Sequence, residues 1–111
     1  MARNATKAEL AQLYQALAGV ATPEQAAALL EDVCTIAEVN EMAQRLEVAF
    51  LLDAGESYLA IQDKTGCSPT TIARVSKALN YGPGGYRAVI DAASATASGA
   101  GAAAGDAGRG L

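Results

Sequence analysis

Signals for helix starts recur along the chain and restrict it to a series of short helices. In the pattern Thr-x-x-Glu, the hydroxyl and the carboxylate each accept a hydrogen bond from a backbone N–H that the helix leaves unpaired. A Ser or Thr before a proline is a second such signal, because proline fits the first helical position. These signals occur at Thr6 with Glu9, Thr22 with Pro23, Thr35 with Glu38, Ser57, and Ser68 with Pro69.

Apolar residues at helical spacing follow each start, and glycine ends several of the segments. We therefore expect an all-α chain of six helices, at about 6–19, 22–33, 35–55, 57–64 and 68–80, with a last one from Tyr86. The third apolar stripe broadens toward its C-terminal end, which favours a helix packed on more than one side. A single amphipathic helix on one core is the alternative.

The end of the chain has a different composition from the rest. From Ala95 it consists almost entirely of Ala, Gly, Ser and Asp, which offer little to bury. We expect a helical domain over residues 1–94 and a disordered tail over residues 95–111.

The supply of bulky core residues is small for a chain of 111 residues. It contains one Phe, four Tyr and no Trp, and much of its hydrophobic fraction is alanine. A single copy would build a thin core, so pairing two copies would help to bury apolar surface.

Several classes of function lack their usual residues. The chain has no His, the commonest general base, and no phosphate-binding loop or cluster of metal ligands. We expect no catalytic residue, no metal, no cofactor and no enzymatic activity. Cys34 and Cys67 are interpreted as reduced thiols which, with Tyr58, serve packing. We find no long apolar segment or signal peptide and expect a cytoplasmic protein without a membrane partner.

The net charge of −4 hides an uneven distribution. Residues 1–55 hold eight acids against three bases. Residues 66–90 hold three bases, Arg74, Lys77 and Arg87, and no acid. A basic region of this kind is expected in a protein that binds a polyanion such as DNA.

That basic region overlaps a helix-turn-helix pattern at residues 57–80. Two short helices are separated by Gly66, which can adopt the backbone conformation that a tight turn requires. The residues predicted to face inward are Ile61, Ile72, Val75 and Leu79.

The opposite face of the second helix is predicted to bind double-stranded DNA. Hydroxyl groups early in such a helix reach phosphates and base edges, and an arginine can bind guanine with two hydrogen bonds. The candidate DNA-binding residues are Ser68, Thr70, Thr71, Arg74 and Lys77. Two alternatives stay open: a polar helix face on an unrelated bundle, and a dimeric protein-interaction module, which the overall acidity would suit.

Arg45 lies in the middle of the third predicted helix. An ion pair with Glu41, one turn earlier, is the interpretation that the sequence favours. Contact with a ligand or a partner chain is the alternative.

Several stretches of the chain resemble a known family. They are Leu30-Glu-Asp-Val-Cys-Thr35-Ile-Ala-Glu38, Ala43-Gln-Arg-Leu-Glu-Val-Ala49, Thr71-Ile-Ala-Arg-Val75 and Leu79-Asn-Tyr-Gly82. The chain is similar over residues 7–93 to the YerC/YecD branch of the Trp-repressor superfamily. The resemblance implies an intertwined homodimer of six-helix protomers that acts as a transcriptional regulator of the repressor type. It also implies that the DNA-reading helices lie at 57–64 and 68–80.

The resemblance also implies a possible effector pocket at Arg45 and Arg74. The tryptophan-binding members of the family hold their corepressor between two arginines at these positions. They carry glycine where this chain has Val75, and serine where it has Ala78. A valine would fill the space of the indole ring, so we do not expect tryptophan to bind, and the identity of any small-molecule effector stays open.

Overall fold

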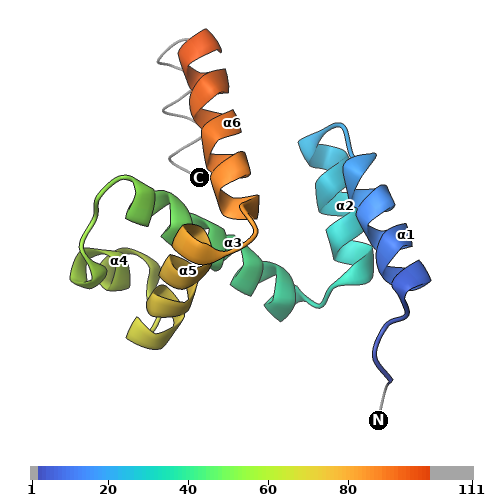
Figure 1. Ribbon diagram of the computed structural model, residues 1–111, viewed down its shortest axis with the longest axis horizontal. Helices are drawn as coiled ribbons and strands as arrows, with labels where there is room; N and C mark the ends of the chain where they lie inside the picture. The colour runs from blue at the N-terminus through green and yellow to red at the C-terminus, as the bar shows by residue number, and fades with distance from the viewer. Residues whose placement is uncertain (1–2, 101–111) are drawn as a thin grey trace. The chain divides into compact units, whose positions relative to one another are not determined.

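The computed structural model describes residues 3–100, and within them it consists of six helices without a strand (Figure 1). The helices are α1 (Lys7–Ala18), α2 (Pro23–Val33), α3 (Ile36–Asp53), α4 (Tyr58–Thr65), α5 (Pro69–Tyr81) and α6 (Gly85–Ala100). The all-α prediction and the six segments are confirmed. No helix in this described range is long and apolar enough to cross a membrane.

The predicted caps account for where the helices begin. The backbone N–H of Glu9 donates to Thr6 Oγ1 over 3.1 Å, and the Thr6 N–H donates to the Glu9 carboxylate over 2.9 Å. Thr35 and Glu38 make the same reciprocal pair at 3.1 and 2.8 Å. Each pair satisfies two N–H groups that a helix start otherwise leaves open.

The chain divides into two compact units, and the division falls inside α3. We call the part up to Asn40 the N-terminal unit and the part from Glu41 onward the C-terminal unit. Each is described below by itself.

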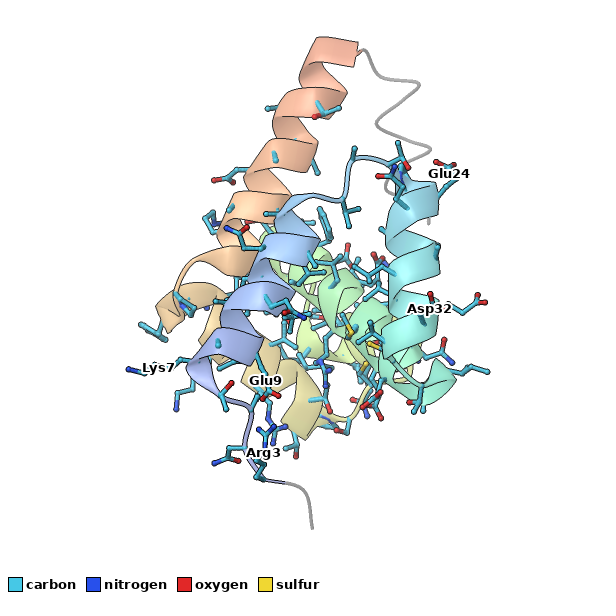
Figure 2. All side chains as sticks on the ribbon, turned by 90° about the vertical axis from the view of Figure 1, so that its right-hand side faces the viewer. Arg3, Lys7, Glu9, Glu24 and Asp32 are labelled. Carbon is cyan, nitrogen blue, oxygen red and sulfur yellow. The ribbon has the colours of Figure 1, made fainter. Side chains whose placement is uncertain are left out.

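The N-terminal unit comprises α1, α2 and the start of α3. None of its described residues is buried. The apolar stripe of α1 is between 37 and 60% exposed and consists of Leu10, Leu13, Tyr14 and Leu17. Arg3 binds Glu9 through two hydrogen bonds of 2.8 and 2.9 Å, which ties the start of the chain to α1 (Figure 2). This unit is thus held by local hydrogen bonds and has no core of its own.

The C-terminal unit contains a hydrophobic core drawn from α3 to α6. Its buried residues are Val48, Ala49, Leu51, Ile61, Cys67, Ile72, Val75 and Ile90. Helix α5 packs on both α4 and α6. Arg87 of α6 forms ion pairs with Asp53 at the end of α3, at 2.9 Å, and with Asp91, at 3.3 Å. The core and this ion-pair group hold α3 to α6 together.

The connection between α5 and α6 depends on glycine. A Cβ on Gly82 would collide with the carbonyl oxygen of Ala78, and Gly84 has a φ of +95°. Helix α6 continues to Ala100, so residues 95–100, which we assigned to the tail, are helical. The rest of the predicted disordered tail lies outside the described residues.

Candidate nucleic-acid interface

The helix-turn-helix at residues 57–80 has the predicted inward face. Ile61 of α4 and Ile72 of α5 are fully buried, Val75 is 1% exposed, and Leu79 packs against the same core. The turn is made by Gly66, whose φ of +74° is left-handed. Because α4 and α5 share one core across a tight turn, the outward face of α5 is presented on a firm support.

Two of the predicted DNA-binding hydroxyls are engaged in starting α5. Ser68 Oγ accepts a hydrogen bond from the Thr71 N–H and donates one to Thr71 Oγ1, both at 3.1 Å. Thr71 is also half-buried. The structure therefore shows Ser68 and Thr71 in the cap of α5, and their predicted contact with DNA stays a prediction.

The other three candidates lie free on the exposed face of α5. Thr70, Arg74 and Lys77 follow one another at spacings of four and three residues, which places them along one side of the helix. All three are exposed, and none has a hydrogen bond or ion pair among the described residues. Their polar groups are available to a ligand.

Two other basic side chains of the C-terminal unit, Lys64 and Arg87, are already paired with acids. Lys64 Nζ lies 2.9 Å from the Glu56 carboxylate. The carboxylates of Asp53 and then Asp91 raise the pKa of the Arg87 guanidinium through hydrogen bonds. Of the three bases in the acid-free window, Arg87 is thus committed to the fold, whereas Arg74 and Lys77 are free.

Arg45 of α3 and Arg74 of α5 line a single polar cleft of about 460 Å³ within the C-terminal unit. The cleft is lined by Glu41, Gln44, Arg45, Gly66, Cys67, Ser68, Thr71 and Arg74. Arg45 is half-buried. The ion pair with Glu41 that we favoured is wrong, since no such contact occurs, and each side chain lines the cleft without pairing the other.

Some members of the cleft were missed from sequence. Gln44 lies in one of the stretches that carry the family resemblance but was given no role of its own, and Gly66 and Cys67 were assigned only to the turn and to packing. The spacing of Glu41 one helical turn before Arg45 was interpreted as an ion pair, whereas the family resemblance was the signal that brought Arg45 and Arg74 together.

The two substitutions that we expected to close a tryptophan site occupy defined places. Val75 belongs to the hydrophobic core and points its bulk into it. Ala78 is half-buried, and its carbonyl accepts a hydrogen bond of 2.9 Å from the Gly82 N–H. Neither Val75 nor Ala78 is among the residues that line the polar cleft.

Cys67 is buried in the core, as its packing role predicts, and Cys34 is half-buried in the N-terminal unit. Tyr58 at the start of α4 is 45% exposed, so it lies outside the buried core and its packing role stays a prediction. Within residues 3–100 no group of three or more His, Cys, Asp or Glu side chains is placed to hold a metal ion.

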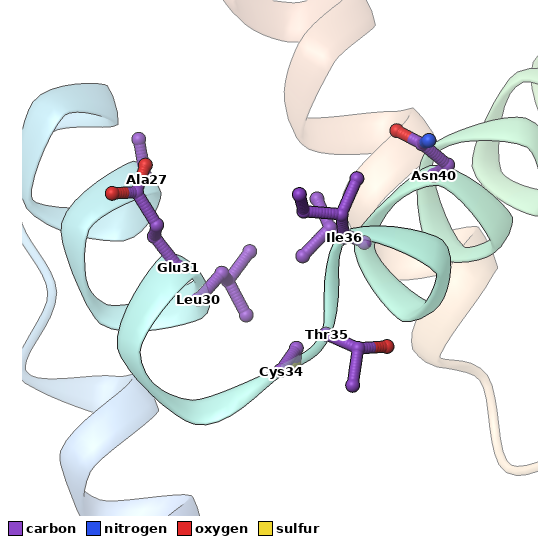
Figure 3. Close-up of a pocket in the computed structure, with 8 residues that line it drawn as sticks. Ala27, Leu30, Glu31, Cys34, Thr35, Ile36 and Asn40 are labelled. Atoms are coloured by element: carbon purple, nitrogen blue, oxygen red, sulfur yellow. The ribbon is translucent and has the colours of Figure 1, made fainter.

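The N-terminal unit contains a groove of different character. Leu30 of α2 faces Ile36 of α3 across it, and Cys34 and Thr35 lie along the connection between the two helices (Figure 3). Its volume is about 250 Å³, and its lining is mainly apolar. Ile36 is 81% exposed, so this groove presents hydrophobic surface to the outside.

The fold and the cleft define an all-α helix-turn-helix protein, and comparison with known proteins gives its family. The family model for the Trp repressor protein matches residues 8–94. The uncharacterized protein YerC of Bacillus subtilis (strain 168) is 41% identical over 83 residues, which span 75% of this chain and 80% of YerC.

Solved structures agree with this match. A TrpR-like protein from Eubacterium eligens ATCC 27750 is 44% identical with a TM-score of 0.72, covering 78% of this chain and 88% of that one. A candidate Trp repressor from Staphylococcus aureus is 31% identical with a TM-score of 0.73, covering 78% and 86%. The chain belongs to the Trp-repressor superfamily, with a YerC-like sequence, and is a helix-turn-helix DNA-binding regulator.

Proposed function

We propose that this chain forms a homodimer that binds specific sequences of double-stranded DNA and represses transcription. The observation that carries the proposal is the outward face of α5, where Thr70, Arg74 and Lys77 are exposed and unpaired on a capped, well-supported helix. Phosphate contacts from such cations position a protein on the duplex, and contacts to base edges in the major groove provide specificity.

Two copies of α5 would enter successive major grooves. In dimeric helix-turn-helix proteins the two half-sites lie about 34–36 Å apart, one turn of the duplex. The preferred operator is then an inverted repeat, with residues 68–77 of each protomer facing one half-site.

The exposed apolar surface of the N-terminal unit is an argument for the proposed dimer. Its α1 stripe and the groove that contains Leu30 and Ile36 are apolar and uncovered. Contiguous exposed apolar surface on a folded protein marks a site of association. A second copy of the chain that covers these surfaces would supply the core that this unit lacks.

The proposal includes no catalytic step, metal or cofactor, and it places the protein in the cytoplasm with its DNA. Tryptophan is not expected to act as the effector, because Val75 is committed to the core and Ala78 carries no hydroxyl. The pair Arg45 and Arg74 is the place where any anionic effector would bind.

Selection of bound sequences from random duplex DNA tests the proposal and measures the half-site spacing. In a mobility-shift assay with the selected duplex, Arg74→Ala and Lys77→Ala are expected to weaken binding. Lys64→Ala is the matched control, because that ammonium is already paired with Glu56. If the wild-type protein binds no duplex tightly at low salt, or the two variants bind like wild type, the proposal fails.

A protein-interaction module is the second candidate, and the acidity of residues 1–55 favours it. Such a dimer would use α5 to contact another protein. Stoichiometric capture of one protein partner by the purified chain, with no nucleic acid retained and no selected duplex, would support it over DNA binding.

A further inference from the structure

The cleft between α3 and α5 carries a charge that the fold leaves uncompensated. Arg45 and Arg74 both line it, and neither has a hydrogen bond or ion pair among the described residues. Glu41 is the one carboxylate among the lining residues, so two guanidinium groups face one acid. Because a half-buried cation such as Arg45 is stabilised by a counter-charge, the cleft favours an anion.

The chemistry of the lining favours a phosphate group over a ring. The two guanidinium groups present planar arrays of N–H donors that match phosphate oxygens. Cys67 is the one apolar side chain among the lining residues, and it is buried in the core, so the lining of the cleft is mainly polar. A flat hydrophobic effector would therefore find donors for its charge but little apolar surface for its ring.

The cleft also adjoins the surface assigned to DNA. Ser68 and Thr71, at the start of α5, line it together with Arg74, while Thr70 continues the exposed face of the same helix turn. In helix-turn-helix complexes the start of the recognition helix lies in the major groove, between the two phosphate backbones. A backbone phosphate is thus the anion that arrives at this place when α5 binds DNA.

We propose that a phosphate of the DNA backbone occupies this cleft between Arg45 and Arg74, so that DNA binding needs no small-molecule corepressor. This inference rests on the proposed function. It adds Arg45, which lies on α3 outside the helix-turn-helix, to the DNA-binding residues. The contact fixes the position of α5 in the groove without reading a base.

The dependence of DNA affinity on salt tests the phosphate contact. With the duplex obtained by selection, Arg45→Ala is expected to weaken binding by about tenfold per protomer at low salt. It should also lower the slope of log K against log salt by about one per protomer, since one phosphate contact is lost. Arg45→Lys should keep the slope, and Glu41→Gln should tighten binding.

Replacement of single phosphates by uncharged methylphosphonates locates the contact. Wild type should lose affinity at one phosphate in each half-site, and Arg45→Ala should be insensitive to that same replacement. Lys64→Ala, with its ammonium held by Glu56, is the matched control and should keep the wild-type sensitivity. Circular dichroism and urea unfolding of each variant show whether it is folded.

The absence of a corepressor is tested on protein unfolded in guanidinium, dialysed and refolded, which frees it of bound small molecules. It should bind the duplex with unchanged affinity, and inorganic phosphate should compete with DNA more strongly than chloride at equal ionic strength. If phosphate instead strengthens binding, or if the stripped protein binds only after addition of a small-molecule extract, the inference is overturned. If DNA binding requires Arg74 but Arg45→Ala has the same salt slope as wild type, the inference is overturned and the proposed function still holds. If the wild-type protein binds no duplex at all, the proposed function is overturned as well.

Discussion

The two units of the chain have similar helices but differ in what holds them. The C-terminal unit surrounds eight buried residues, among them Ile61, Ile72 and Ile90. The N-terminal unit has no buried residue in its described part, and its helices carry capping boxes and the Arg3–Glu9 pair. Local caps determine where a helix begins, but short helices are only marginally stable without packing, so the N-terminal unit needs a cover for its apolar side chains that the C-terminal unit already has.

The largest expected effect is a truncation in the C-terminal core. Ile72→Ala removes buried methyl and methylene groups and should lower the free energy of unfolding by about 2–5 kcal/mol. Urea unfolding followed by circular dichroism measures it, with Ile72→Val, expected to cost about 0.5–1.5 kcal/mol, as the conservative control. A loss below about 0.5 kcal/mol for the alanine variant would show that this unit does not depend on the described core.

The next effect concerns association through the N-terminal unit. Leu13 is half-exposed on the α1 stripe, so Leu13→Ala should remove about 1 kcal/mol of burial per protomer in a dimer. Two protomers then weaken the dimer by roughly 30-fold, which sedimentation equilibrium can measure. Gln12→Ala, on the opposite side of α1, should leave the dissociation constant unchanged.

Equal dissociation constants for Leu13→Ala and wild type would remove the stripe from the interface. A melting temperature independent of protein concentration would argue against a dimer altogether. Either result would sharpen the contrast between the units, because the N-terminal helices would then have to be stable with uncovered apolar faces.

A smaller effect is expected at the turn of the helix-turn-helix. Gly66 has a φ of +74°, so Gly66→Ala should cost about 1–2 kcal/mol through backbone strain, with no steric clash to add to it. Gly85→Ala is the matched control, because Gly85 starts α6 without a left-handed φ and has open space around it. Thermal unfolding of both variants checks the difference, which should vanish if the turn can rearrange freely.

The smallest effect lies at the start of α1. The hydrogen bonds from Arg3, and then from the Thr6 backbone, lower the pKa of Glu9 from 4.5 to about 2. A carboxylate whose pKa falls on folding adds stability above its unfolded pKa, and that contribution is lost as the pH falls from 4.5 toward 2. We expect fraying of α1 over this range.

NMR titration of the Glu9 carboxyl carbon measures this pKa, and Arg3→Ala should raise it toward its ordinary value. Both side chains are largely exposed, so the effect on global stability is small. A midpoint near 4.5 in the wild-type protein would show that Arg3 and Glu9 do not stay paired in solution.

The helix starts could be predicted from sequence because a cap uses residues only three positions apart. Thr6 with Glu9 and Thr35 with Glu38 form in the structure the hydrogen bonds that their spacing indicates. The inward face of α5 followed from the period of its apolar residues for the same local reason.

The functional surface was harder to predict because it depends on contacts between distant residues. Sequence could not show that the Ser68 and Thr71 hydroxyls bind each other, or that Arg87 is neutralised by Asp53 of another helix. It also paired Arg45 with Glu41 by spacing alone, although both side chains line a cleft completed by α5. The extension of α6 to Ala100 was missed because alanine permits a helix even where it offers little to bury.

The separation of the buried core from the uncovered N-terminal apolar surface has a genetic consequence. If association relies on the N-terminal unit, a substitution on the outward face of α5 leaves a chain that still assembles with normal copies. In a cell that makes both forms, mixed assemblies would carry one intact reading helix and one damaged one. Alleles altered at Arg74 should therefore be dominant over the normal gene, while alleles that destroy the core at Ile72 should be recessive.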